Sequence, residues 1–357
     1  VTGGTYFPPR PMYGRKSFGE LLRTLVSVWD NERDKIYTTA DQISSHLQQK
    51  AVLNETEHPE LNWQAEEQAV AQFRSSFDSQ YGGFSYQPQN KFPPSMGLML
   101  LLRHHHRTGD SFSLEMVEKT LKKMYAGGIY DQLGGGLSRY STDYKWLVPH
   151  FEKMLYDNAL FVWALIETFQ ITKNPVYETG VRDVLSYIEK IMTSSNGAFF
   201  SAEDADSEGV EGKFYLWSKA EVMEILGIES GELACTYWDI TENGNFEGSS
   251  IPNRPRSDQD VAKDFRITAE ELQDQLRIAR QKLMAVRTKR IRPLLDNKVL
   301  TSWNALMISA FARAARVFGD SSLLIRIFEK TLKISAKYNF KKTKKQNWNL
   351  HFKKNIK

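Results

Sequence analysis

One segment near the middle of the chain holds side chains that could transfer protons. His150 and Glu152 follow Pro149, and Tyr156 lies four residues after Glu152. Proline suits the first helical position, so we expect His150 and Glu152 in a first turn, with Glu152 and Tyr156 on one face. The helix dipole disfavours a charged imidazole there, and a neutral His150 could act as a general base. The alternative interpretation is a helix cap with ordinary packing.

Three acidic residues, Asp204, Asp206 and Glu208, alternate along a second segment. In an extended segment all three would point the same way. Such a cluster could bind a cation, or supply an acid and a base for glycoside chemistry. The segment begins like a calcium loop, but its twelfth position is Tyr215 instead of Glu, which excludes an EF-hand. The alternative interpretation is a solvated acidic loop.

Aromatic and polar residues in other motifs are of the kinds that bind sugars. Tyr130, Asp131 and Arg139 lie in or beside a glycine-rich stretch, and Trp217 and Trp303 lie in later motifs. Flat aromatic faces with hydrogen-bonding neighbours suit sugar rings, which combine apolar patches with hydroxyls. The alternative is that the aromatic rings pack against helix ends.

Two further polar groups have plainer interpretations. Asp296, Lys298 and Asn304 form a mixed polar group before a helix, where they could cap the helix or, as the alternative, contact a substrate. Lys153 and Asp157 are four residues apart, a spacing that favours a pair on the surface of a helix.

The sequence offers little for a metal site. His104, His105 and His106 are adjacent, and neighbouring helical positions point about 100° apart, so they cannot converge on one ion. The single cysteine, Cys235, excludes an internal disulfide framework and a cysteine-rich zinc site. We therefore expect no metal and no cofactor.

Composition and charge set limits on the class of protein. The 357 residues are 41% hydrophobic and 12% aromatic, which is typical of a globular protein and excludes disorder as the dominant state. Residues 341–357 carry seven Lys and no acid, so the rest of the chain is mildly acidic. We expect this end to be an unstructured tail, and nucleic-acid binding through it is the alternative. No signal peptide or membrane-spanning run is evident, which favours the cytoplasm and no membrane partner; the sequence identifies no protein partner.

The elements that must position these residues are mostly helices. Apolar spacing and capping residues predict a series of helices, and only two stretches, 198–201 and 213–217, resemble strands. The expected helices are 17–49, 65–77, 98–102, 113–124, 151–169, 177–191, 218–227, 268–286, 302–318 and 321–338. Glycine-rich loops with aromatics follow every second helix, so they would emerge at one end of the assembly. This pattern predicts a toroid of helical hairpins, whereas an α-solenoid would need a fixed short repeat.

Four long motifs carry a resemblance to a known family. They are GGIYDQLGGGLSRYSTDYKWLVPHFEKMLYDNALF (127–161), DADSEGVEGKFYLW (204–217), WDITENGNFEG (238–248) and LDNKVLTSWNALMISAFA (295–312). The sequence resembles the spermatogenesis-associated protein 20 family over residues 1–335. The resemblance implies a thioredoxin-like domain followed by a six-hairpin, glycosidase-like (α/α) toroid.

The resemblance also implies how the chain is divided. Residues 1–50 would be the last part of the thioredoxin-like domain, without the family's cysteine motif, and 60–340 a truncated toroid. An incomplete toroid would leave apolar helix faces exposed. The sequence departs from the family at Ser138, where His is usual, and at Ala305, where Gly is usual. The first departure removes a possible acid–base group.

Two functions from different classes follow from these residues and the resemblance. The first is a carbohydrate-active enzyme, an epimerase, isomerase or hydrolase, with His150 as base and Arg139 holding the substrate. Glu152, Asp204 or Asp206 would then act as acid or stabiliser. The second is a non-catalytic, redox-regulated scaffold or interaction protein linked to spermatogenesis. Convergence of these side chains on one cavity would favour the enzyme.

Overall fold

The computed structural model describes residues 7–12, 14, 16–51, 63–84 and 90–323. The chain forms two compact units, Val1–Trp63 and Gln64–Lys357. Several sequence predictions lie outside the described residues. These are the strand expected at the start of the chain, most of the boundary at 50–59, the helix at 321–338 beyond residue 323, and the basic tail at 341–357.

The first unit contains two helices, α1 (Phe18–Asn31) and α2 (Arg33–Ala51), where one continuous helix was predicted. The capping box of Ser17 and Glu20 at the start of α1 is confirmed. The helix ends at Asn31, and the next residue, Glu32, leaves the helical conformation with φ −135°. Just before it, the Asn31 side chain donates a hydrogen bond to the Ser27 carbonyl, and such local bonds compete with the helical pattern. The thioredoxin-like origin of this unit stays a prediction.

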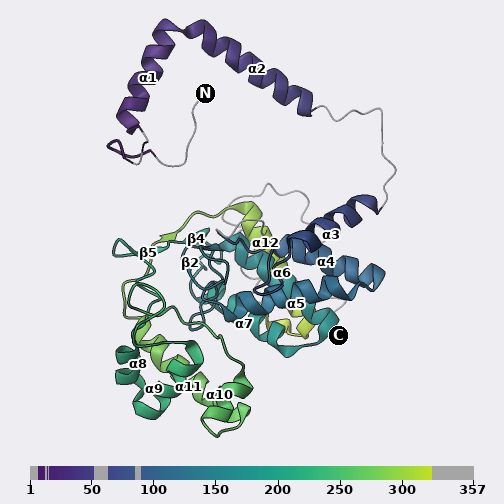
Figure 1. The fold of residues 1–357 in the computed structure, drawn as a ribbon, viewed down its shortest axis with the longest axis vertical. Coiled ribbons are helices and arrows are strands. Elements are labelled where there is room, and N and C mark those ends of the chain that lie inside the picture. The colour runs from purple at the N-terminus through teal and green to yellow at the C-terminus, as the bar shows by residue number, and fades with distance from the viewer. Residues whose placement is uncertain (1–6, 13, 15, 52–62, 85–89, 324–357) are drawn as a thin grey trace. The chain divides into compact units, whose positions relative to one another are not determined.

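The second unit is built around helical hairpins (Figure 1). Two-residue turns join α4 to α5 and α6 to α7, so the helices in each pair run antiparallel. Helix α6 is buried along most of its length and packs against α4, α7 and α12, while α5 covers α4. The bounds are α3 Gln64–Ser76, α4 Ser95–Thr108, α5 Ser111–Ala126, α6 Leu155–Thr172, α7 Pro175–Lys190 and α12 Thr301–Phe318. The predicted mainly helical, hairpin-built (α/α) fold is confirmed.

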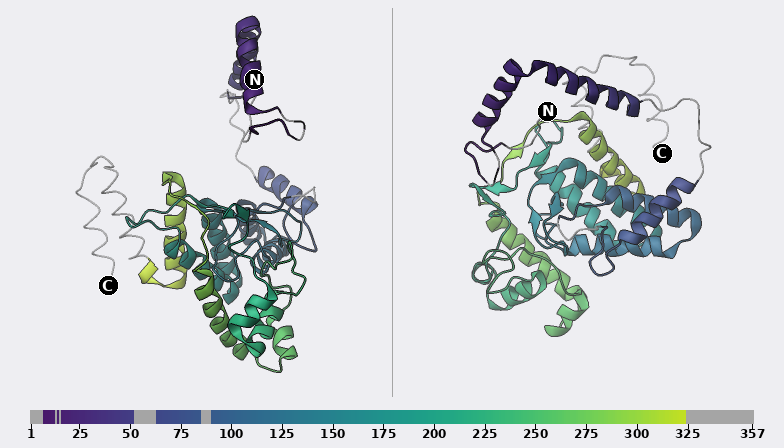
Figure 2. Two further views of the ribbon diagram at one scale, coloured as in Figure 1. Left: turned by 90° about the vertical axis from the view of Figure 1, so that its left-hand side faces the viewer. Right: turned by 45° about the horizontal axis from the view of Figure 1, so that its top comes forward.

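A smaller group of helices has its own hydrophobic core and lies to one side of the hairpins (Figure 2). Ser218, Ser257 and Thr268 each accept a hydrogen bond from a backbone N–H in the first turn of the helix that follows. These caps fix the starts of three helices, and two of the three starts, at 218 and 268, were predicted from the sequence. The bounds are α8 Lys219–Leu226, α9 Ile228–Trp238, α10 Asp258–Asp264 and α11 Ala269–Arg287.

Three small antiparallel sheets of two-residue strands connect these elements. The strands are β1 Tyr140–Ser141, β2 Pro149–His150, β3 Lys153–Met154, β4 Ala202–Glu203, β5 Asp206–Ser207, β6 Val210–Glu211 and β7 Leu295–Asp296. β1 pairs with β2, β5 pairs with β6, and β4 lies between β3 and β7. The strands expected at 198–201 and 213–217 were wrong, because only single bridges form there, at Phe199 and Trp217.

Two helix starts were also predicted wrongly. Pro149 begins strand β2, so His150 and Glu152 are not in a helical turn, and α6 starts at Leu155. The helix expected from residue 113 begins at Ser111, because its cap is Asp110, whose side chain accepts from the Ser113 N–H. None of the described helices is both long and apolar enough to cross a lipid bilayer.

Candidate functional site

A cleft of about 750 Å³ lies beside the sheet formed by β3, β4 and β7, and we call it the Glu152 cleft. Three predicted site residues line it: Glu152, Asp204 and Trp303. The other lining residues are Met154, Ser201, Ala202, Leu294, Leu295, Asp296, Asn297, Lys298 and Leu300. The cleft therefore joins segments that are far apart in the sequence.

Arg139 and Glu152 form an ion pair at this cleft. The Arg139 Nη1 lies 3.0 Å from the Glu152 Oε2, and the Arg139 backbone N–H donates to the Glu152 carbonyl at 2.8 Å. Burial acts to lower the pKa of Arg139, but the interactions with Glu152 and Tyr156 together outweigh it and raise that pKa overall. The Arg139 Nε is buried and has no hydrogen-bond partner among the described residues, so one donor is left for a ligand or water.

The first turn of α6 brings two more polar groups beside this ion pair. The Tyr156 ring packs edge-on against Trp303, with 4.7 Å between ring centroids. Asp157 has a buried Oδ2 without a hydrogen-bond partner in the part of the chain that the structure describes. Burial raises the pKa of Asp157 to about 7, with the charge of Glu152 adding to the rise and Arg139 opposing it. Asp157 is therefore a carboxyl group that can hold a proton near neutral pH.

The predicted surface pair of Lys153 and Asp157 was wrong. Lys153 is buried and bonds to Asp131 at 2.9 Å, on the other side of the strand. The prediction assumed a helix through both residues, whereas β3 ends and α6 begins between them.

His150 lies at the edge of the site in a chain of polar contacts. Its Nδ1 is 2.7 Å from the Glu211 Oε1, its Nε2 is 3.8 Å from the Glu152 Oε2, and its ring stacks on Tyr140. The helix-dipole argument for His150 does not hold, because the residue is in a strand. Sequence reasoning missed Glu211, whose place opposite the histidine depends on the β5–β6 turn.

The alternating acids are only partly brought to the site. Asp204 is exposed and lines the Glu152 cleft, whereas Asp206 is exposed on β5 and does not line it. Glu203, which directly precedes Asp204, is buried and accepts hydrogen bonds from Tyr187 and Arg292. The sequence showed that Asp204 and Asp206 alternate, but nothing in it showed that the neighbouring acid, Glu203, is buried.

Of the predicted substrate-binding residues, Trp303 lines the cleft, Arg139 and Tyr156 contact side chains that line it, and the other four do not line it. Tyr130 is buried against other aromatic rings, and Asp131 is held by Lys153. Trp217 is buried, with the Arg290 guanidinium 4.0 Å above its ring. Asn304 is buried and bonds to backbone groups. A direct substrate role for these four stays a prediction that their placement does not support.

Asn304 and Asn158 make the same set of contacts, and each is the fourth residue of its helix. The Asn304 side chain accepts from the Phe199 N–H at 2.8 Å and donates to the Phe199 carbonyl at 3.0 Å. The Asn158 side chain accepts from the Leu137 N–H at 2.8 Å and donates to the Leu137 carbonyl at 3.0 Å. Both are followed by Ala-Leu in the sequence, a repeated pattern that could have indicated their shared role. These two asparagine clamps fix the loops that precede the site.

The described residues contain no group of three His, Cys, Asp or Glu side chains that could hold a metal ion. The adjacent histidines diverge, since His104 contacts Glu66 at 2.7 Å while His105 contacts the Asp110 carbonyl at 2.9 Å. The groups at the site are carboxyls, an imidazole and a guanidinium, which can act as acids, bases and hydrogen-bond donors.

Comparison with known proteins shows homology over most of the chain. The chain is 32% identical to human spermatogenesis-associated protein 20, over 90% of the chain and 45% of that protein, and 31% identical to its mouse counterpart, over 90% and 44%. The chain thus spans about half the length of the curated relatives that it matches. No family model matches the chain.

Solved structures similar to this chain include two sugar epimerases. One is a sugar epimerase from a ruminal bacterium, with TM-score 0.36 and 14% identity over 75% of this chain and 83% of that one. The other is cellobiose 2-epimerase from Bacillus thermoamylovorans, with TM-score 0.36 and 12% identity over 77% of this chain and 86% of that one. Likenesses at this level carry no argument about the site or its substrate.

Proposed function

We propose, for this homologue of spermatogenesis-associated protein 20, that the Glu152 cleft binds a sugar and transfers protons on it. The names of the relatives state no reaction, so the proposal rests on the residues at the cleft. The observation that carries it is the pair of carboxyl groups Glu152 and Asp157. Glu152 is paired with Arg139, while Asp157 is buried with a pKa of about 7. Asp157 does not itself line the cleft, but it lies close enough to Glu152 and Arg139 for their charges to act on it. Carboxyl groups held in such different states close together are suited to act as base and acid.

The surroundings of these carboxyl groups support a polyhydroxylated substrate. Trp303 and Tyr156 supply aromatic faces, and Arg139 retains an unpartnered Nε among the described residues. Asp204 and Lys298 add acceptors and donors along the cleft wall. Its volume of about 750 Å³ is in the range of small-molecule sites.

The chemistry that these groups could perform is removal of a proton from a carbon beside the sugar carbonyl. Glu152 would accept the proton, with His150 3.8 Å away and itself hydrogen-bonded to Glu211, while protonated Asp157 would donate to the carbonyl oxygen. In epimerisation, the intermediate turns its other face to Glu152, takes the proton back on the same carbon, and returns the oxygen-bound proton to Asp157. In isomerisation, Glu152 gives the proton to the former carbonyl carbon, and Asp157 accepts the proton of the neighbouring hydroxyl, which becomes the new carbonyl. Glycoside hydrolysis is the competing reaction, because it also uses two carboxyl groups.

The experiment is NMR of the chain incubated in D₂O with a panel of aldoses, ketoses and disaccharides. Epimerase or isomerase chemistry places deuterium on the carbon beside the carbonyl, whereas hydrolysis releases new reducing ends without it. We expect deuterium incorporation, reduced about 100-fold or more in Glu152→Gln and at least about 10-fold in Asp157→Asn.

Glu229→Gln is the matched control, because this carboxylate is exposed on α9, outside the cleft. Its turnover should equal that of the unmodified chain. Equal turnover in Glu152→Gln and Asp157→Asn would remove both residues from the mechanism. If no sugar of the panel binds or reacts, the enzyme proposal fails and the scaffold function gains support.

A further inference from the structure

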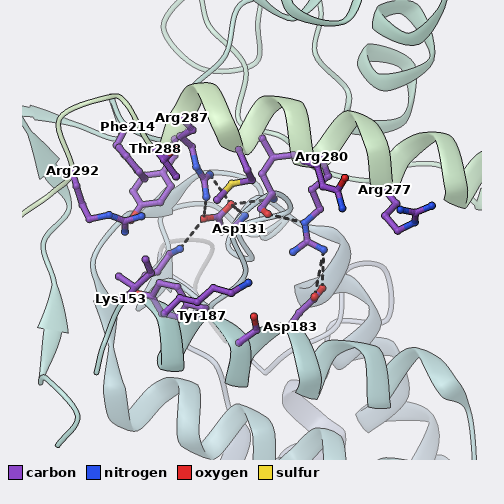
Figure 3. Close-up of a pocket in the computed structure, with 18 residues that line it drawn as sticks. Asp131, Lys153, Asp183, Tyr187, Phe214, Arg277, Arg280, Arg287, Thr288 and Arg292 are labelled. Atoms are coloured by element: carbon purple, nitrogen blue, oxygen red, sulfur yellow. Dashed lines mark hydrogen bonds and ion pairs between the residues drawn. The ribbon is translucent and has the colours of Figure 1, made fainter. Parts of the chain in front are cut away.

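A second cavity, of about 530 Å³, lies on the other side of strand β3, between α7 and α11 (Figure 3). We call it the Asp131 cavity. It is strongly cationic, since six basic residues and two carboxylates line it. The basic residues are Lys153, Lys190, Arg277, Arg280, Arg287 and Arg292, and the carboxylates are Asp131 and Asp183.

The alternation of side chains along β3 separates this cavity from the Glu152 cleft. Lys153 and Glu203 are paired in register, so their side chains share one face of the small sheet. Met154 and Ala202 are paired on the opposite face, and both line the Glu152 cleft. Lys153 instead lines the Asp131 cavity. The two hollows therefore have different walls and different charges.

The buried charges at the base of the Asp131 cavity do not balance. Asp131 bonds to Arg287 through two oxygens at 2.9 Å each, and to Lys153 at 2.9 Å, as Figure 3 shows. The side chains of Lys153, Arg287 and Asp131 are only 2%, 3% and 7% exposed. One carboxylate thus lies between two buried basic side chains, and burial lowers the pKa of Lys153.

The nearby acids already have cationic partners of their own. Glu203 is paired with Arg292, and Asp183 lies 3.3 Å from Arg280. Because Glu203 and Asp183 are already paired, no carboxylate among the described residues around the cavity balances the second basic side chain beside Asp131. An uncompensated buried charge is costly, and an anion in the cavity would offset that cost.

Two buried donors at the cavity also lack partners among the described residues. They are the Arg287 Nε and the Tyr215 hydroxyl, and both residues line the cavity. Buried polar groups nearly always have a partner, so these two atoms indicate a missing ligand or water. Gly134 permits the arrangement, because a Cβ there would lie 1.9 Å from the Arg287 Nη2.

We propose that the Asp131 cavity binds a small phosphate monoester. The unmatched buried cation, the Arg287 Nε and the Tyr215 hydroxyl would hold the phosphate. Lys190 is exposed and lines the cavity with Arg277, which adds positive charge toward the solvent for the second negative charge of the ester. A planar monoanionic carboxylate would satisfy fewer of these donors. This site is independent of the proposed function of the Glu152 cleft.

The experiment is isothermal titration of the chain with glucose 6-phosphate, inorganic phosphate, glucuronate and glucose. We expect glucose 6-phosphate to bind at least about 10-fold more tightly than glucuronate, glucose not to bind at this site, and the affinity to fall as salt rises. Inorganic phosphate should compete with glucose 6-phosphate. Tighter binding of glucuronate than of glucose 6-phosphate would overturn the assignment to phosphate.

Tyr215→Phe and Lys190→Gln test the site without disturbing the buried ion pairs. Tyr215→Phe removes a hydroxyl that has no described partner, so we expect unchanged folding and an affinity for glucose 6-phosphate reduced about 5-fold or more. Lys190→Gln should weaken binding and its salt dependence. Lys282→Gln is the matched control, because Lys282 is exposed on α11 and does not line the cavity. Equal affinity in all three variants, or no binding of either phosphate compound, would overturn the proposal.

Discussion

The Asp157 carboxyl group connects the chemistry of the Glu152 cleft with the stability of the protein. Its Oδ2 is buried, and burial keeps the proton on the group to a higher pH than in an unfolded chain. The same feature that suits it to proton transfer therefore makes the folded state sensitive to pH.

Asp157→Asn should change how stability depends on pH. The pKa of Asp157 is about 7 in the folded chain, against an ordinary value of 3.8, so the folded state binds the extra proton between these values. The stability contributed by the protonated form is complete below pH ~4 and is lost as pH rises through ~7. We expect Asp157→Asn to match the unmodified chain near pH 4 and to be the more stable of the two by an amount that grows with pH, reaching about 3–4 kcal/mol at pH 8.

Urea unfolding at a series of pH values measures this difference, with Glu229→Gln as the exposed control. A constant difference between Asp157→Asn and the unmodified chain from pH 5 to pH 8 would show that the Asp157 carboxyl titrates normally.

The sequence was sufficient to identify several side chains at the cleft, but not the direction in which each one points or the partner that it meets. Glu152, Asp204, Arg139 and Trp303 were identified from motifs and chemistry, and all of them lie at or beside the cleft. The partner of His150 could not be identified in this way, because a tertiary turn brings Glu211 to it. The buried state of Asp157 likewise depends on packing that no local pattern encodes.

At the scale of elements, the small sheet of β3, β4 and β7 separates two hollows of opposite chemical character. Capping boxes and apolar spacing identified most helices, because these signals span one or more turns. Strands of two residues have no detectable period, so the sheet was not predicted. The loops that lead into it are fixed by the asparagine clamps on α6 and α12.

Asn304→Ala and Asn158→Ala should each destabilise the protein by ~2–4 kcal/mol. Each replacement leaves a buried backbone N–H and C=O, of Phe199 or Leu137, without the side-chain partner that they now have. Urea denaturation gives the free energy of unfolding. Asn297→Ala, at an exposed loop position, should change it by less than ~0.5 kcal/mol.

Asn304→Asp provides a sharper test of the clamp. It keeps the acceptor for the Phe199 N–H but loses the donor to the Phe199 carbonyl. It should therefore be at least as destabilising as Asn304→Ala, because a buried carboxylate would face a carbonyl oxygen. Stability equal to the unmodified chain would contradict the clamp.

At the scale of the whole molecule, the hydrophobic cores of the described residues all belong to the second unit. The three clusters of buried apolar side chains run from Val70 to Leu323, and α1 has no buried residue. The stability of the second unit should therefore depend little on the first.

Deletion of residues 1–63 should leave the main thermal unfolding transition within ~2 °C of that of the full chain. Circular dichroism and calorimetry of the two proteins measure this, and glucose 6-phosphate titration checks that the Asp131 cavity is retained. A Tm lowered by more than ~5 °C would show that the first unit supports the second.

The alternation along β3 limits how this segment can change in evolution. Glu152 and Lys153 are adjacent in the chain, but Glu152 lines the acidic Glu152 cleft and Lys153 lines the basic Asp131 cavity. Insertion or deletion of one residue here would move each side chain to the opposite face of the sheet, and so into the other hollow. Homologous proteins can therefore differ in the amino acids of this segment, but we expect the number of residues in it to stay the same.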